Sequence, residues 1–401
     1  MPRSRITLSF WTAAFVVVLT QWGSAAASVT YPLYAQEWDL TPLVTTTIFA
    51  IYPVTLVIVL TLFGGISDHI GRRAALLIGV SLLAAGGLAL ALAPDVVWLY
   101  IGRAIQGAGV GLSLGAASAS LVDFNATGNP SRASSVNTLA QSVGLVAATV
   151  VGGALIQYAP LPLHLSFWLL FTLILLAIVL ITFMPKHDPY DSDGNLKSSG
   201  NAWKPRPVGV PNGSRRIFIA SAFAGFTGLG VGSIILSLDA QIAKDLIHTD
   251  SALIQGLILA ISSVFIGVVA LAFRRVPPRI SVVIGGLTSA LAILLFIPSA
   301  SLHSLPIYLI AQVFAGAALG FSLLGGIGLI HRYAPAHHRG MLISAFYLVA
   351  YVGQGLVSTL AGITATGAGL AMTVDVFAPI LAVVGVATAI VGSITGRQRT
   401  R

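Results

Sequence analysis

Long apolar segments recur along almost the whole of this 401-residue chain, and they decide what it can fold into. Hydrophobic residues make up 56% of the sequence and charged residues only 8%, whereas about a quarter of the residues of a soluble domain are charged. A helix that crosses the hydrocarbon core of a bilayer needs about 20 apolar residues, and about twelve such segments fit this chain. The sequence therefore predicts an all-α membrane protein with twelve transmembrane helices.

The apolar segments form two sets of six, separated by a polar stretch. The first set is predicted at about 6–30, 43–66, 74–93, 97–123, 135–158 and 165–185, and the second at about 216–241, 251–273, 280–299, 305–330, 341–366 and 371–396. The stretch between the sets is rich in proline and charge, as solvated linkers are. We expect an N-terminal six-helix bundle over 1–185, a cytoplasmic linker over 186–215 and a C-terminal six-helix bundle over 216–401.

Basic residues are distributed unevenly over the predicted loops. With the N-terminus inside, 19 of the 21 Lys and Arg residues fall on inner loops and tails, leaving Lys244 outside and Arg103 within a helix. Cytoplasmic loops of membrane proteins carry such an excess of positive charge. We therefore expect a multi-pass protein of the cell inner (plasma) membrane with both termini in the cytoplasm.

The two sets of helices repeat each other weakly. The segment that begins at Arg103 in the fourth helix matches the segment that begins at Gln312 in the tenth, with two glycines and a serine in common at an offset of 209 residues. Parallel repeats of this kind are typical of transporters whose substrate site lies between two bundles. The sequence thus predicts two pseudo-symmetric six-helix bundles.

A charged, glycine-bearing turn lies between the second and third predicted helices. It contains Gly64, Asp68, Gly71, Arg72 and Arg73 in the pattern Gly-x-x-x-Asp-x-x-Gly-Arg-Arg. This pattern resembles the loop between helices 2 and 3 of the major facilitator superfamily. The resemblance extends over nearly the whole chain and implies that superfamily's twelve-helix fold, of the drug or sugar efflux type.

The resemblance also implies roles for the charges of this turn. In the superfamily the residue at the place of Asp68 caps the start of helix 11, and Arg72 would pair with an acid at the inner end of helix 4, here Asp123. We expect these residues to form a gate at the inner face when the cavity opens outward. The second copy of the turn, at 273–279, lacks the Asp and the Gly, so the gate is expected in one half only.

Arg103 is the one basic residue inside a predicted helix, where a charge costs about 2.5–3.5 kcal/mol on insertion scales. With Gln106 and Gly107 it resembles the superfamily's helix-4 motif, which implies a place beside the cavity and a part in proton coupling. Gln21 on the first helix is a plausible partner. The alternative is a structural arginine that extends to the surface or tethers a neighbouring helix.

The fifth helix carries part of the glycine signature of antiporters. Gly144, Gly152 and Gly153 match it, but Ala148 and Thr149 stand where the signature has Gly-Pro. Small residues at this spacing also allow ordinary close packing of helices. Both interpretations remain open, and the partial match weakens the case for antiport without removing it.

Other polar side chains mark faces that could line a cavity. Tyr347, Tyr351 and Gln354 share one face of the eleventh helix, and Asn137 and Gln141 form a polar edge on the fifth. Tyrosines at a membrane surface can also be simple anchors. We interpret these five residues, together with Gln312, as candidates for substrate binding or coupling.

Acids inside the predicted helices are rare. Besides Asp123 they are Asp239 in the seventh helix and Asp375 at the start of the twelfth. Asp239 follows a glycine-rich run at 225–232, where a helix bends easily, and it is the group that we expect to bind and release a coupled proton. The alternative is a solvated helix end, with Asp239 paired to Lys244.

Several functional classes lack support in the sequence. It contains no cysteine, no phosphate-binding loop and no metal-ligand spacing, so we expect no enzyme activity, no metal and no cofactor. The net positive charge follows the membrane topology, which argues against a nucleic-acid partner. We expect a monomer whose partners are the lipid bilayer, a small-molecule substrate and protons.

These features predict a secondary active transporter, with proton-coupled efflux of a small amphiphilic or neutral compound, drug or sugar-like, by alternating access as the leading hypothesis. A symporter or uniporter for a small organic anion or a sugar is the alternative, because Arg103 and amides without a central acid suit neutral or anionic substrates. A non-transporting membrane sensor with the same fold is a third hypothesis, and the intact charged turn argues against it.

Overall fold

The computed structural model describes residues 3–127, 130–185, 209–249, 251–335 and 338–395, and these residues are almost entirely helical. The longer helices are α1 (Arg3–Ala25), α3 (Pro42–Phe63), α5 (Arg72–Ala91), α6 (Val96–Asp123), α7 (Pro130–Tyr158), α8 (Leu165–Thr182), α9 (Arg215–Asp245), α10 (Ala252–Ala272), α11 (Pro278–Ser301), α12 (Leu305–Tyr333) and α13 (Arg339–Ile394). Two short helices, α2 (Tyr31–Glu37) and α4 (Ser67–Ile70), and the 3-10 turn Asn212–Ser214 join them.

The last of these helices, α13, holds two membrane spans. Its 56 residues would extend about 84 Å as one straight helix, far more than the hydrocarbon core of about 30 Å. The backbone breaks at Gly369, where φ is 88° and ψ is 166°, a conformation that favours glycine because it has no Cβ. Eleven described helices are long and apolar enough to cross a bilayer, and this break makes twelve spans, as predicted.

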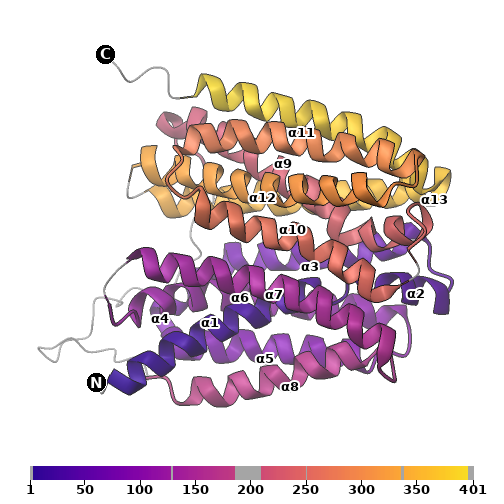
Figure 1. Cartoon of the computed structure of the whole chain (residues 1–401). Coiled ribbons are helices and arrows are strands. Elements are labelled where there is room, and N and C mark those ends of the chain that lie inside the picture. The colour runs from indigo at the N-terminus through magenta and orange to yellow at the C-terminus, as the bar shows by residue number, and fades with distance from the viewer. Residues whose placement is uncertain (1–2, 128–129, 186–208, 250, 336–337, 396–401) are drawn as a thin grey trace, which may run out of the picture.

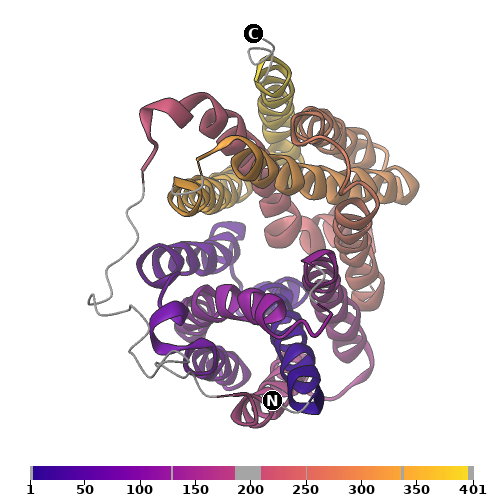
Figure 2. The same cartoon turned by 90° about the vertical axis from the view of Figure 1, so that its left-hand side faces the viewer.

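The helices run side by side in two groups, and the start of α1 and the end of α13 lie at the same end of the bundle (Figure 1). Seen along the helices, α1 to α8 gather on one side and α9 to α13 on the other (Figure 2). We refer to the end that holds Arg3 and Ile394 as the predicted inner face, and to the opposite end as the predicted outer face. The predicted twelve-helix fold is confirmed.

The two groups meet along α7 with α10 and along α3 with α13. Near the predicted outer face, Leu43 N donates to Thr366 Oγ1 at 2.8 Å and Ala252 N donates to Gln157 Oε1 at 3.0 Å. Small residues allow this contact, since a Cβ on Gly153 would lie only 2.6 Å from the carbonyl oxygen of Ala252. The backbones of α7 and α10 therefore cross closely.

Some predicted boundaries require correction. The first helix ends at Ala25 rather than at 30, and the chain then forms α2 as a separate short helix. The fifth helix begins at Pro130, five residues before the predicted start, and α9 begins at Arg215, within the predicted linker. Most of that linker, 186–208, lies outside the described residues, and the division into bundles at 186–215 stays a prediction.

The contact at the predicted outer face can be tested by cross-linking. The natural chain has no cysteine, so Leu43→Cys with Thr366→Cys provides a defined pair. We expect efficient disulfide formation in membranes, which would keep the two halves joined after cleavage at a protease site placed in the linker. Thr366→Cys alone is the control. Halves that separate under oxidising conditions would show that these helix ends are apart.

Candidate functional site: two buried polar clusters and a charged gate

The charged turn at the predicted inner face is held together by Arg72. Its Nη1 lies 2.5 Å from Asp68 Oδ1, and its Nε lies 2.9 Å from Asp123 Oδ2. Gly71, with φ 86°, separates α4 from α5 and allows the chain to turn tightly here. The structure thus brings together the three charges that the resemblance implied, while capping of helix 11 by Asp68 stays a prediction.

The remaining residues of this turn tie neighbouring helices together. Arg73 Nη1 donates to the carbonyl oxygen of Met184, beyond the end of α8, at 3.2 Å, and Gly64 ends α3 with a hydrogen bond from its N to Leu60 O. Both acids of the ion pairs are nearly half exposed, so each pair contributes no more than about 1 kcal/mol. Such weak pairs suit a contact that forms and breaks.

Arg103 is completely buried among α1, α3 and α6. Its Nη1 donates to the carbonyl oxygens of Gly23 and Ser24 at 3.1 and 3.2 Å and to Gln106 Oε1 at 3.2 Å, and its guanidinium lies 4.3 Å from the ring centre of Tyr52. Because Arg103 has no exposed surface, it does not extend to the membrane surface. It does tether α1, as one sequence-based alternative proposed.

These contacts compensate the charge of Arg103 only in part. The carbonyl end of α1 attracts a cation by up to about 2 kcal/mol, and a desolvated cation–π contact contributes about 2 kcal/mol. However, Arg103 Nε and Nη2 and Gln106 Nε2 are buried without a hydrogen-bond partner, at a cost of about 1–3 kcal/mol each. No carboxylate among the described residues forms an ion pair with Arg103. The cluster therefore contains more hydrogen-bond donors than acceptors, and these donors surround a positive charge.

A second buried cluster surrounds Asp239 in the other half. The hydroxyl of Tyr308 donates to Asp239 Oδ1, and Gln312 Nε2 donates to the same oxygen at 2.6 Å. Asp239 is 1% exposed, and its Oδ2 has no hydrogen-bond partner. No ion pair to Lys244 is present, so the alternative of a solvated helix end paired to that lysine is wrong.

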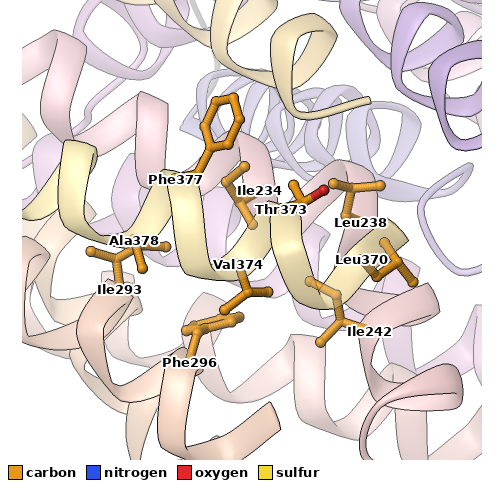
Figure 3. A pocket seen from close by; sticks show the side chains of 10 residues that line it. All are labelled: Ile234, Leu238, Ile242, Ile293, Phe296, Leu370, Thr373, Val374, Phe377 and Ala378. Atoms are coloured by element: carbon orange, nitrogen blue, oxygen red, sulfur yellow. The ribbon is translucent and has the colours of Figure 1, made fainter. Parts of the chain in front are cut away.

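An apolar pocket between α9, α11 and α13 begins at the residue before Asp239. Leu238, the residue before it, lines a pocket with Phe296 and Val374 in which Thr373 carries the only side-chain oxygen (Figure 3). The ring of Phe296 also packs edge-on against Tyr308, with ring centres 5.2 Å apart. A carboxylate that is buried, with no ion pair to a cation among the described residues, is costly to keep ionised.

The two clusters occupy matching places in the repeat. Arg103 is the eighth residue of α6 and Gln312 the eighth residue of α12, at the offset of 209 found in the sequence. In the first half a cation bonds to the end of α1; in the second half an amide bonds to a carboxylate on α9. Equivalent positions therefore carry a cation in the first half and, in the second, a neutral amide that bonds to a carboxylate on another helix.

The other predicted candidates lie elsewhere. Gln21 does not contact Arg103; its Nε2 donates to Gln141 Oε1 at 3.2 Å and joins α1 to α7. Asn137 accepts from Ser118 Oγ at 3.0 Å. Tyr347 and Tyr351 stack with ring centres 5.9 Å apart, and Gln354 is buried. Their part in transport stays a prediction.

The partial antiporter signature on α7 serves close packing. A Cβ on Gly152 would lie 2.9 Å from the side chain of Val29, and Gly144 packs against the backbone of α1 at Val18. Thr149 is buried against Gly256 of α10. These contacts agree with the packing interpretation and leave antiport without structural support.

Sequence reasoning missed the aromatic partners of both clusters. Tyr308 precedes Gln312 by four residues, so the two share a helix face, and this spacing was a usable signal. Tyr52 and Tyr31 come from α3 and α2, and Tyr31 lies close enough to Arg103 to interact electrostatically. Nothing in their local sequence pointed to that arginine, because the contacts are between distant segments.

Twelve apolar spans in two similar halves, each with one buried polar cluster, are typical of a membrane transporter. A family model confirms this class: that of the Major Facilitator Superfamily matches residues 13–276. The chain belongs to this superfamily. No curated protein sequence matches it.

Solved structures agree with this assignment. The chain is similar to a D-xylose–proton symporter at 17% identity, over 96% of this chain and 97% of that chain, with a TM-score of 0.76. It is also similar to a POT family transporter in complex with 5-aminolevulinic acid, at 14% identity over 97% and 94% of the two chains and a TM-score of 0.75. The nucleoside transporter NupG matches at 14% identity over 98% and 99%, with a TM-score of 0.72. At these identities the likeness shows the fold alone.

The charged gate yields a prediction about resting conformation. Asp68→Asn removes one of the two charges that hold Arg72, so charge-assisted hydrogen bonds become weaker. We expect a shift of the resting population toward the state that is open at the inner face, and a slower turnover. A distance probe across the inner ends of the two halves measures the shift, and an unchanged distance would contradict the gate assignment.

Proposed function

We propose that this protein is a proton-coupled secondary transporter and that Asp239 is the group that binds the proton. The observation that carries the proposal is the burial of this carboxylate beside Tyr308 and Gln312 without any cation. Low-dielectric surroundings favour the neutral form of a carboxyl group, and exposure to water favours the ionised form. Alternating access would change that exposure in every cycle.

Proton coupling is also consistent with the structural neighbours. One of them is named as a D-xylose–proton symporter, and this sequence contains no phosphate-binding loop that would support direct use of ATP. By analogy, the energy for transport comes from an ion gradient. The predicted cytoplasmic location of both termini, in the cell inner membrane, rests on the distribution of basic residues and belongs to this proposal.

The direction of transport is the second part of the proposal. The leading sequence-based hypothesis is efflux of a drug or sugar-like compound, but the helix-5 glycines that favour antiport are engaged in packing. The uncompensated cation at Arg103 instead favours the second hypothesis, a symporter for a small organic anion. We therefore propose proton-coupled transport as the function and symport as its form.

The proton site is tested by substrate-driven proton movement in proteoliposomes, with D-xylose, uridine, an alanine dipeptide and benzoate as trial substrates. We expect Asp239→Asn to abolish most of the proton flux, because an amide in the same place cannot take up a proton. Tyr308→Phe should alter the pH dependence of the flux and leave part of it.

The matched control is Asp375→Asn, which removes an exposed acid from α13. This variant should retain the proton flux of the natural protein. An Asp239→Asn variant that moves protons as well as the natural protein does would overturn the proposed proton site.

A further inference from the structure

Each half of the molecule buries one ionisable side chain that forms no ion pair within the described residues. Arg103 lies in the first half and is paired with no described carboxylate, and Asp239 lies in the second half and is paired with no described cation. A carboxylate removes its charge by taking up a proton, but an arginine side chain keeps its charge at all physiological pH values. The two sites therefore need different ions: a proton at Asp239 and an anion at Arg103.

The unpartnered atoms around Arg103 have the chemistry of an anion site. Arg103 Nε and Nη2 and Gln106 Nε2 are all N–H donors without a hydrogen-bond partner among the described residues, and the hydroxyl of Tyr31 lies near enough to the same guanidinium to interact with it. A carboxylate accepts hydrogen bonds from a guanidinium with two oxygens at once. A water molecule could accept the same hydrogen bonds but would leave the positive charge without compensation.

Tyr52 adds a flat aromatic surface on one side of the guanidinium, 4.3 Å from it. Its ring packs against the face of the guanidinium, and Nε and Nη2 at the edge have no hydrogen-bond partner among the described residues. Because Nη1 is already committed to Gly23 and Ser24, the free edge is formed by Nε and Nη2. This is the edge that a bidentate carboxylate uses.

We propose that Arg103, with Gln106 and Tyr31, binds the anionic group of an organic substrate, so that one proton and one monovalent organic anion cross the membrane together. The inference rests on the proposed function and names its substrate class: small carboxylic acids or similar monoanions. The loaded carrier then holds a proton at Asp239 and an anion at Arg103, and the transported pair has no net charge.

The binding step can be measured without knowing the natural substrate. Thermal unfolding of the purified full-length protein is followed with acetate, lactate and benzoate, and with the matching neutral amides, at constant chloride concentration. We expect at least one carboxylate, and none of the amides, to raise the unfolding temperature. Arg103→Gln should lower the affinity for that carboxylate by about 30-fold or more. Arg103→Lys keeps the charge without the planar fork and should bind with intermediate affinity.

Arg279→Gln is the matched control, because Arg279 also donates to carbonyl oxygens at a helix end, those of Gly392 and Ser393. It should leave carboxylate binding unchanged. Stabilisation by none of the three carboxylates, or equal stabilisation of natural protein and Arg103→Gln, would overturn the proposal. If Arg103→Gln does not fold, Arg103→Lys decides: unchanged carboxylate affinity in that variant also overturns it.

The charge balance gives a second, independent outcome. In proteoliposomes, uptake of the carboxylate that binds should respond to a pH gradient but not to an imposed membrane potential; a strong response to potential would contradict paired transport. Loss of carboxylate binding in Arg103→Gln with unchanged proton flux in Asp239→Asn would reject the proton site and retain the anion site. Unchanged carboxylate binding in Arg103→Gln, together with loss of proton flux in Asp239→Asn, would reject the anion site alone.

Discussion

A charge buried inside a membrane protein has to be paired, neutralised or used, and this constraint organises the molecule. Only 8% of the residues of the chain are charged, and among the described residues most of these charges lie at or near the ends of helices. Arg103 and Asp239 are buried instead, in clusters that satisfy only some of their polar atoms. Burying these charges costs free energy of folding, so we infer that they are kept for function and not for stability.

The packing of the helices determines how the two halves contact each other. Glycines bring α7 against α10, and small polar contacts join the helix ends at the predicted outer face. At the predicted inner face, the weak and half-exposed ion pairs of Arg72 join α4, α5 and α6 within the first half. Movement of one half against the other would have to change the contacts of α7 with α10 and of α3 with α13.

Sequence reasoning succeeded where a local pattern has one physical solution. Apolar length predicted the spans, and the spacing from Asp68 to Arg73 pointed to the family. The orientation inferred from the uneven Lys and Arg distribution stays a prediction. Sequence reasoning was less successful where the answer depends on distant segments. Gln21 was expected beside Arg103 but joins Gln141 instead. The rotation of α1 about its own axis decides which neighbouring helix a side chain meets, and the local sequence does not give that rotation.

The state of Asp239 shows the same limit. Its sequence position near Lys244 allowed a solvated helix end, and only the approach of Tyr308 and Gln312 from α12 shows that it is buried. The division of α13 was predictable from the sequence, because the break at Gly369 falls between the predicted helix ends at 366 and 371. For Asp239, tertiary packing and not local composition decides the burial.

The most direct test of this account is the protonation state of Asp239. Infrared difference spectroscopy of the natural protein and the Asp239→Asn variant resolves the band of a protonated carboxyl group. The account predicts a band near neutral pH that is absent from the variant and that disappears when the carrier is driven to expose Asp239 to water. A carboxylate that is ionised in every state, with no such band, would contradict it.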